Sequence, residues 1–300
     1  MTPSVGIIIL NWNSYDVTAR CLESFSQVDY SNYEVILVDN GSSDDSGNKL
    51  LEGFPWITLL KNDKNLGFTG GNNTGIRYAV ERKLDYIMLL NNDTVVTEKF
   101  LTVLIDSIKS DPKIGAIQPK ILYYKAQDTI WNAGGTYIAF LGIAPSRGDG
   151  EKDNGQYDKR FDTRWITGCC FLLPRQIVEE IGPLDDKFFI YFEDADWSFK
   201  IRKLGKRLLY EPGAFIYHEA GMSDNNRDKN KEGNVSPFAH YQGVRNHLFM
   251  IRRYSRGLNL IGCWLFQFVK ISGYLGYFLV RGRFTKFKFV LRGVKDGLTQ

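Results

Sequence analysis

An aspartate follows one of the apolar runs of the sequence, at the point where a buried strand would end. Asp93 comes three residues after the run Ile87–Leu90, and Asn91 stands two residues before it. Side chains two residues apart leave a strand on the same face. A carboxylate and an amide oxygen there could hold Mg²⁺ or Mn²⁺ against a diphosphate, since these cations take one or two carboxylates and complete their shell with phosphate oxygens. Asn-Asn-Asp-Thr is also ordinary turn or N-cap chemistry, so the spacing alone leaves both interpretations open.

The densest group of acids lies among aromatic residues further along the chain. Glu193, Asp194 and Asp196 stand close to Phe192 and Trp197. A carboxylate in aromatic surroundings is desolvated, and its raised pKa suits a general base that takes a proton from a hydroxyl. Acids in the first turn of a helix would also complement the helix dipole, and both interpretations can hold together.

Two further segments offer polar groups to a ligand. Asp39 and Asn40 end another apolar run, where they could read the edge of a base, although a helix N-cap is the alternative. The glycine-rich segment 65–75 would let backbone approach a ligand before opening a helix whose first amides attract anions. It is not a dinucleotide fingerprint, because GxGxxG is absent. His218 follows the apolar run 214–217, and a lone histidine there is structural unless Asp93 lies beside it.

The elements that must position these residues alternate up to about residue 120. Short apolar runs predict strands over 5–10, 34–39, 57–61, 86–90 and 114–118, and helix-period segments predict helices near 17–25, 45–51, 73–82 and 98–110. This alternation indicates an α/β fold with a mostly parallel sheet and helices on both faces. In such sheets ligands bind at the carboxyl ends of the strands. The irregular, glycine-rich residues 121–165 predict mobile loops over a cleft.

Composition and charge exclude several classes of protein. The 300 residues are 43% hydrophobic and 24% charged, which is typical of a globular chain and excludes a disordered tail, a disulfide mini-protein and a polytopic membrane protein. Residues 240–300 hold 11 Lys and Arg against one acid, whereas residues 1–239 hold 27 against 33. The main body is therefore acidic, and we expect no nucleic-acid partner. The four cysteines form no metal or disulfide pattern, which fits a protein of the reducing cytosol. The short N-terminal apolar run lacks signal-peptide features, so we expect the protein not to be secreted.

The basic C-terminal segment combines apolar and cationic residues. The apolar stretch Leu258–Val280 is long enough to span a membrane, but Lys270 at its centre would cost about 2.5–3.5 kcal/mol there, which favours an in-plane or hairpin arrangement. Beyond it, apolar residues recur at helical spacing among cations: Phe284, Phe287, Val290, Leu291 and Val294 among Arg281, Arg283, Lys286, Lys288, Arg292 and Lys295. This pattern predicts an interfacial helix drawn to anionic lipid. A helical appendage packed on the catalytic domain or on another subunit is the alternative.

Six motifs in one order and spacing carry a resemblance to a known family. They are Ile8–Asn13, Val38–Asp44, Asn65–Phe68, Leu90–Thr94, Thr167–Phe171 and Glu193–Trp197. Over about residues 4 to 255 the chain resembles the family-2 glycosyltransferases of GT-A fold, in particular their bacterial rhamnosyltransferase-like branch. The resemblance implies a GT-A catalytic domain over 1–240, with a nucleotide-binding half (1–120) and an acceptor half (121–240), followed by a helical tail over 241–300.

The resemblance also implies a role for each matching residue. Asp194 would be the catalytic base, and Asp93 with His218 would hold the metal, Mg²⁺ or Mn²⁺. Asn91 stands where the family has the first Asp of its DxD motif, which removes one charge from the site. The nucleotide-sugar would be bound by Asn11, Asn13, Asp39, Asn65, Gly67, Phe68, Asn91 and Asn92, and the sugar or acceptor pocket would include Trp131, Gly168, Glu193 and Trp197.

The expected activity follows from these roles. An inverting transferase would move a sugar, rhamnose first, from dTDP-rhamnose, or next a UDP-sugar, to a hydroxyl of a lipid-linked saccharide in cell-surface polysaccharide synthesis. The protein would be cytoplasmic and peripheral on the inner face of the cell membrane. It could form a homo-oligomer. The rival from another class is a catalytically silent sugar-binding or scaffold protein of a membrane assembly. A sugar-nucleotidyltransferase and a dehydrogenase are disfavoured, because neither glycine-rich signature follows the first strand.

Overall fold

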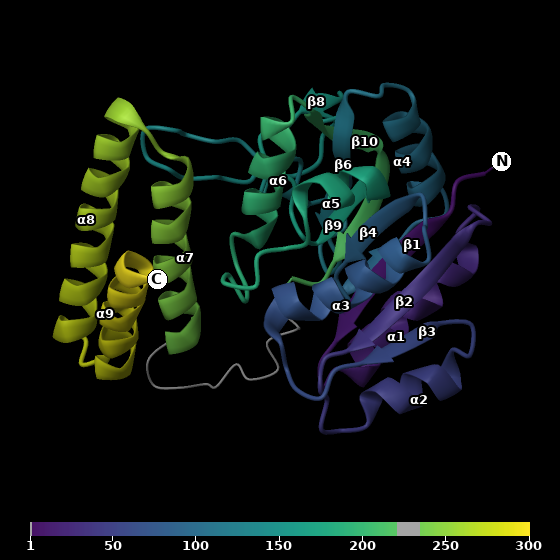
Figure 1. Cartoon of the computed structure of the whole chain (residues 1–300), viewed down its shortest axis with the longest axis horizontal. Helices are drawn as coiled ribbons and strands as arrows, with labels where there is room; N and C mark the ends of the chain where they lie inside the picture. The colour runs from purple at the N-terminus through teal and green to yellow at the C-terminus, as the bar shows by residue number, and fades with distance from the viewer. Residues whose placement is uncertain (1, 221–234) are drawn as a thin grey trace. The chain divides into compact units, whose positions relative to one another are not determined.

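The computed structural model describes residues 2–220 and 235–300 (Figure 1). These residues form two compact units. The first contains residues 2–136, 145–189 and 193–220, and the second contains 137–144, 190–192 and 235–300. Each is described by itself.

The N-terminal half of the first unit is a parallel sheet with the expected strands. Strands β1 (Val5–Asn11), β2 (Tyr33–Asp39), β3 (Thr58–Lys61) and β4 (Tyr86–Leu90) lie in the order β3-β2-β1-β4 and pair in parallel. Helices α1 (Tyr15–Glu23), with the 3₁₀ turn η1 (Ser24–Gln27), α2 (Ser46–Gly53) and α3 (Gly67–Glu81) connect them. Ile7 and Ile9 belong to one buried cluster and Ile8 to another, because successive side chains point to opposite faces. Both faces are thus covered.

The rest of the sheet is mixed, whereas the sequence predicts a mostly parallel one. After β5 (Thr94–Val96) and α4 (Phe100–Lys109), β6 (Ile114–Tyr123) lies between β9 (Cys170–Pro174) and β10 (Arg207–His218). Strand β9 is antiparallel to both β4 and β6, because the chain enters it from a loop excursion rather than from a crossover helix. Helices α5 (Arg175–Ile181) and α6 (Glu193–Lys203) lie between β9 and β10 in the sequence.

The excursion between β6 and β9 has regular pairing, which corrects the expectation of irregular loops. Strand β7 (Ile130–Asn132) pairs with β6, and β8 (Phe161–Asp162) pairs with β10. Isolated antiparallel bridges join Thr129 to Lys152, Gly135 to Ser146 and Ile138 to Ile143. The many glycines here serve tight turns of a paired segment, and several of them adopt positive φ.

Helix α3 begins at Gly67, six residues before the helix start expected from sequence. The glycine-rich segment is therefore mostly helical. A Cβ on Gly71 would lie 2.4 Å from Leu10, and one on Gly75 would lie 2.5 Å from Ile8. These glycines let α3 pack closely on β1, so most of the segment serves helix–sheet packing rather than a ligand loop.

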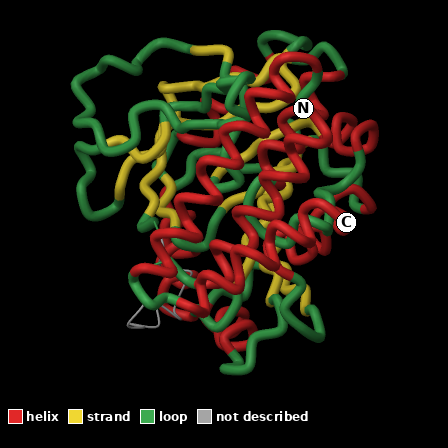
Figure 2. The backbone as a smooth tube through the Cα atoms, turned by 90° about the vertical axis from the view of Figure 1, so that its left-hand side faces the viewer, coloured by secondary structure: helices red, strands yellow, loops and turns green. Residues whose placement is uncertain are grey.

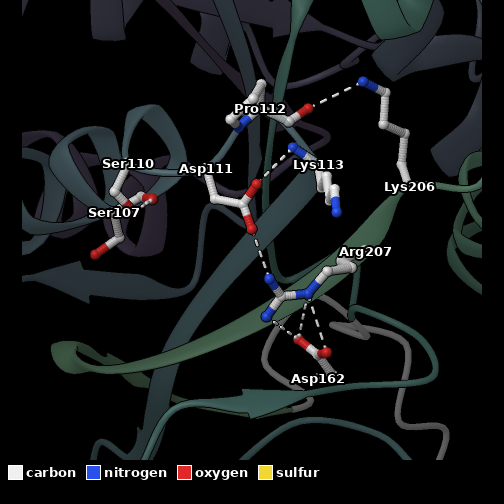
Figure 3. Close-up of polar contacts among 8 residues, drawn as sticks. All are labelled: Ser107, Ser110, Asp111, Pro112, Lys113, Asp162, Lys206 and Arg207. Atoms are coloured by element: carbon white, nitrogen blue, oxygen red, sulfur yellow. Dashed lines mark hydrogen bonds and ion pairs between the residues drawn. The ribbon is translucent and has the colours of Figure 1, made fainter.

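The first residue of β10 is held by a polar network at the opposite end of that strand from His218 (Figure 3). Arg207 bonds Asp162 through Nε at 3.0 Å and Asp111 through Nη1 at 2.6 Å, and Lys206 donates to the carbonyl of Pro112 at 2.9 Å. Because every one of these groups is paired to another, the network anchors the strand. An open hollow lies beside this network, and Arg160 and Phe161 also line it. The charged side chains around the hollow are paired with opposite charges, as Arg160 is with Glu211.

The second unit is built from three helices that run side by side, α7 (Pro237–Tyr254), α8 (Gly257–Val280) and α9 (Phe284–Thr299) (Figures 1 and 2). Ser236 caps α7 by accepting a hydrogen bond from the N–H of Ala239 at 3.1 Å. Val244 and Leu248 of α7 pack with Phe278 and Val290 in a buried cluster, which Phe287 and Val294 extend. Phe287, Val290 and Val294 of α9 therefore face the helices, and Lys286 beside them is buried, whereas Phe284 and Leu291 are exposed. An interfacial α9 stays a prediction.

Helix α8, in contrast, leaves one apolar face uncovered. The exposed residues on this face are Leu258, Ile261, Leu265, Phe268, Val269, Leu279 and Val280. Gln267 is buried on the other side of α8, and Lys270 is partly buried there with its ammonium over the ring of Tyr274. By length and composition α8 is long and apolar enough to cross a membrane.

Candidate active site

The carboxyl ends of three parallel strands bring the predicted site residues to one edge of the sheet. Asn11 of β1 is the register partner of Asp39 of β2, and Ile9 of β1 is the partner of Leu90 of β4. At the usual spacing of about 4.8 Å between strands, β2 and β4 are about 10 Å apart. Beyond β4, the N–H of Asn91 donates to the carbonyl of Cys169 at 2.9 Å, which adds the segment before β9 to the same edge.

A buried chain of amides and hydroxyls holds these strand ends together. Asn92 donates to Thr18 Oγ1 at 2.8 Å, Thr18 donates to Asn11 Oδ1 at 2.9 Å, and Asn11 donates to Ser46 Oγ at 2.8 Å. Asn11 is fully buried and Asn92 nearly so. These internal hydrogen bonds fix β1 and β4 against α1 and α2, and a contact of Asn11 or Asn92 with the nucleotide stays a prediction.

Asp39 and Asn13 shape the turn after β2. Asp39 Oδ1 accepts the N–H of Ser42 at 3.1 Å, and Asn13 Oδ1 accepts the N–H of Ser43 at 2.8 Å. Gly47 leaves the space that the other carboxylate oxygen of Asp39 fills. These hydrogen bonds form a turn, whereas the alternative that the sequence left beside base contact was a helix N-cap. A base contact by Asp39 or Asn13 stays a prediction.

Asn40, which the sequence places with Asp39 at a possible base contact, organises the loop before α3. Its Nδ2 donates to Asn65 Oδ1 and to the carbonyl of Gly67, both at 3.1 Å, while its Oδ1 accepts from Asn62 and from the N–H of Leu66. Its position directly after a predicted strand was the available signal. The contacts of Asn65, Gly67 and half-buried Phe68 with a nucleotide-sugar stay predictions.

Asp93 meets His218 beside β4. Strand β10 pairs with β5 so that His218 is the partner of Thr94, and its Nε2 lies 3.0 Å from Asp93 Oδ1. Both side chains are buried, and the Trp131 ring stands edge-on to the imidazole with centroids 4.3 Å apart. The sequence treated His218 as structural unless Asp93 lies beside it, and the structure places Asp93 there. Asn91 is half-buried next to this pair.

Asp93 and His218 suit a divalent cation that also binds the oxygens of a diphosphate. One carboxylate and one imidazole are few ligands, and the described residues hold no cluster of three or more His, Cys, Asp or Glu that could enclose a metal. Mg²⁺ and Mn²⁺ need no such cage when phosphate oxygens and water complete the shell. Among the described residues, His218 Nδ1 is buried without a hydrogen-bond partner, as a group awaiting a ligand or water would be.

Asp194 lies in the first turn of α6 and faces the segment before β9. Its Oδ2 accepts the N–H of Gly168 at 3.0 Å, and its Oδ1 accepts the N–H of Ala195 at 2.7 Å. A Cβ on Gly168 would lie 3.0 Å from the ring of Phe68, so Phe68, Gly168 and Asp194 are brought together. Burial raises the pKa of Asp194, and the two backbone hydrogen bonds oppose that shift.

Glu193 is buried beside Asp194. Burial, together with the charge of Asp194, raises the pKa of Glu193 well above its usual 4.5. Its Oε2 has no hydrogen-bond partner among the described residues. Burial raises the pKa of both carboxyls, and two adjacent buried carboxyls do not both ionise easily.

Helix α3 is hydrogen-bonded to the turn that leads to Glu193 and Asp194. Asn73, buried inside α3, donates to the carbonyl of Leu184 at 2.9 Å and accepts the N–H of Leu184 at 3.0 Å. The N–H of Thr69 donates to the carbonyl of Phe189 at 3.1 Å. Sequence analysis did not single out Asn73, although a buried amide within a predicted helix was the available signal.

Trp197 does not belong to a pocket, which corrects the sequence expectation. Its ring is fully buried against Phe171, with centroids 5.5 Å apart, and its Nε1 donates to the carbonyl of Gly182 at 3.0 Å. It is a core residue that fixes α6 on the sheet.

Comparison with known proteins decides the family. Residues 6–182 match the model of glycosyl transferase family 2, and this range covers the strand ends with Asp39 and Asp93 and the segment with Gly168. The chain belongs to glycosyl transferase family 2. This family-2 enzyme is a glycosyltransferase that uses a nucleotide-sugar donor.

Two relatives of this family-2 enzyme are named as a rhamnosyltransferase and a poly-N-acetylglucosamine synthase. The chain is 25% identical over 240 residues to N-acetylglucosaminyl-diphospho-decaprenol L-rhamnosyltransferase of Mycobacterium tuberculosis, which covers 74% of this chain and 78% of that protein. It is 26% identical over 225 residues to poly-beta-1,6-N-acetyl-D-glucosamine synthase of Staphylococcus aureus, covering 71% of this chain and 49% of that protein.

The solved structures establish the GT-A fold of this family-2 enzyme. Mannosyltransferase PcManGT from Pyrobaculum calidifontis, in complex with GDP-Man and Mn²⁺, superposes with a TM-score of 0.59 at 14% identity. The match covers 100% of this chain and 88% of that one.

Proposed function

We propose that this enzyme is an inverting, metal-dependent transferase that moves rhamnose from dTDP-rhamnose to a hydroxyl of a lipid-linked saccharide. The observation that supports it best is the continuous hydrogen-bonded connection from Asp194 through Gly168 and Cys169 to Asn91, two residues before Asp93. An acid–base residue and a metal-ligand pair at one sheet edge are the parts that this transfer needs.

In the proposed reaction the acceptor hydroxyl attacks C1 of the donor sugar as the bond from C1 to the diphosphate oxygen breaks. A divalent cation bound by Asp93 and His218 would neutralise the charge on the leaving diphosphate. Asp194 takes the hydroxyl proton, and Gly168 fixes the orientation of its carboxylate. A single displacement inverts the anomeric centre. The raised pKa of Glu193 favours a single negative charge on the pair, which we assign to Asp194 as the base.

The donor and acceptor are proposed from the relatives. The mycobacterial relative is named for rhamnose transfer to a decaprenol-linked sugar, and its match covers 74% of this chain. A UDP-hexose is the second choice of donor. The two share the site chemistry argued above and differ only in the base and sugar.

The helical tail supports the proposal that the acceptor is met at a membrane surface. The exposed apolar face of α8 begins beside Arg256 and ends beside Arg281, both exposed. A face of this kind with cations at its ends suits a helix that lies in the interface of an anionic leaflet. The buried Gln267 and the packing of α8 against α9 favour this in-plane arrangement over a span, and we propose the inner face of the cell membrane as its location.

Screening nucleotide-sugars tests the donor. Melting temperature measured with dTDP-rhamnose, UDP-glucose or GDP-mannose, each with Mn²⁺ or Mg²⁺, is expected to rise most for dTDP-rhamnose, because a ligand bound to the native state raises its stability. NMR of the product formed on an undecaprenyl-diphosphate N-acetylglucosamine acceptor should show an inverted C1. Retention at C1, or no metal-dependent cleavage of any donor, would contradict the proposal.

Flotation with vesicles tests the membrane face. Leu265→Asp on α8 should strongly reduce binding of the full chain to vesicles of 30% phosphatidylglycerol in phosphatidylcholine. Leu291→Asp, an exposed leucine of α9, is the matched control and should bind as the unaltered chain does. Equal binding by both variants and the unaltered chain would exclude this face.

A further inference from the structure

The backbone immediately before the two buried acids adopts an unusual conformation. Phe189, Tyr191 and Phe192 have φ of 62°, 72° and 73°, a left-handed region that non-glycine residues rarely occupy. Glu193 and Asp194 follow directly in the sequence. Strained residues of this kind persist only when surrounding groups hold them, and they gather at functional sites.

One side chain of the helical unit holds this turn. Asn246 of α7 is fully buried, and its Nδ2 donates to the carbonyl of Ile190 at 2.8 Å and to that of Tyr191 at 2.9 Å. Its Oδ1 accepts from Arg245 Nε at 2.9 Å, so the amide orientation is fixed. Asn246 and residues 190–192 belong to the same compact unit.

The next residue of α7 supports the same turn. The ring of Phe192 lies against the imidazole of His247, with centroids 5.1 Å apart and planes tilted by 30°. His247 Nε2 lies 2.7 Å from the carbonyl oxygen of Gly142 and its Nδ1 lies 2.9 Å from Gln267 Nε2, so the ring is itself held. Two successive residues of α7 thus fix the two residues that precede Glu193.

We propose that Asn246 is a positioning residue of the transferase, acting through the 190–192 turn to set the place of Asp194. This rests on the proposed role of Asp194 as base. An amide suits the requirement, because it supplies two N–H donors from one uncharged nitrogen to two successive carbonyls. Aspartate would present an acceptor to those carbonyls, and alanine would leave both carbonyls without the amide.

The test compares full-length variants with donor and acceptor at saturation. Asn246→Ala should lower kcat at least tenfold, change KM for the donor less than twofold, and shift the acid limb of the kcat profile, because Asp194 is displaced. Arg252→Ala is the matched control, since Arg252 is an exposed α7 residue that donates to the carbonyl of Gly297, and it should keep kcat and the pH profile unchanged.

A second-site change separates positioning from simple folding. Tyr191→Gly in the Asn246→Ala chain removes the cost of positive φ at an exposed residue, so it should restore at least part of the lost kcat. Unchanged kcat and pH profile in Asn246→Ala would overturn the proposal. A loss of kcat that Tyr191→Gly does not restore would also overturn it, because the Asn246 amide would then contribute to stability alone. If Asp194→Asn is fully active, the proposed function fails instead, whatever the Asn246 variants show.

Discussion

The backbone N–H of Gly168 donates to Oδ2 of Asp194 at 3.0 Å, across 26 residues of sequence. The neighbouring carbonyl of Cys169 accepts the N–H of Asn91. A peptide segment before an antiparallel strand therefore connects the acid of α6 to the end of a parallel strand. This one segment therefore links Asp194 to the strand end that precedes Asp93.

Replacing Asp194 by asparagine tests its role as base. Asparagine keeps the size and can still accept from Gly168, but it takes no proton. We expect kcat to fall by about 10²–10⁴, the usual contribution of a positioned acid–base group, with the donor KM little changed. Steady-state kinetics with saturating acceptor measure this. Turnover near that of the unaltered enzyme would remove Asp194 from the mechanism.

The acid limb of the rate should reflect the raised pKa of Asp194. The base must be ionised to accept a proton, so kcat falls as pH drops through that pKa, at a higher pH than an exposed aspartate with its pKa of 3.8 would give. A profile of kcat from pH 4 to 9 in constant ionic strength checks the position of the limb. A rate that stays flat down to pH 4 would contradict the assignment.

Glu193 links stability to pH in a direction that can be worked out. Its pKa is raised in the folded chain, so the stability it contributes is fully present below the unfolded value of 4.5 and is lost as pH rises toward the folded pKa. Glu193→Gln removes this dependence. The melting temperature of the variant relative to the unaltered protein should therefore rise between pH 5 and pH 8. A constant difference would show that Glu193 titrates normally.

Asp93 and His218 should control the response to metal. With Asp93→Asn the concentration of Mn²⁺ needed for half-maximal stabilisation by dTDP should rise at least tenfold. His218→Gln should act in the same direction more weakly, because this variant loses the imidazole but keeps the carboxylate of Asp93. Thermal shifts with and without Mn²⁺ measure this independently of turnover. The shift with dTDP alone is the control and should not change. Unaltered Mn²⁺ dependence in both variants would place the cation elsewhere.

The parallel half of the fold was predictable from the sequence because its signals are local. Buried apolar runs of β1, β2 and β4 carry their own period and their own turns, and the structure reproduces them within one residue. Strand β9 and the long β10 depend on pairing with strands far away in the sequence, which a local pattern does not contain. The mixed character of the sheet follows from these two.

The site was predictable in type rather than in detail. Asp93, Asp194 and His218 were identified by residue type and motif, and the structure places His218 beside Asp93. Sequence could not separate a ligand contact from an internal one, because Asn11 shows its hydrogen-bond partners only after folding. The same limit hid Asn246, whose partners lie 55 and 56 residues away.

The close packing of α3 on β1 depends on glycine at position 75. A Cβ there would stand 2.5 Å from Cγ2 of Ile8, a fully buried branched side chain that has little room to move. Gly75→Ala should therefore lower the free energy of unfolding by about 1–3 kcal/mol. Gly243→Ala is the matched control: it lies inside α7 with open space around its Cβ, so alanine should stabilise by about 0.5–1 kcal/mol. Urea denaturation of the two variants measures both signs, and a Gly75→Ala chain as stable as Gly243→Ala would show that α3 can move away from β1 without loss.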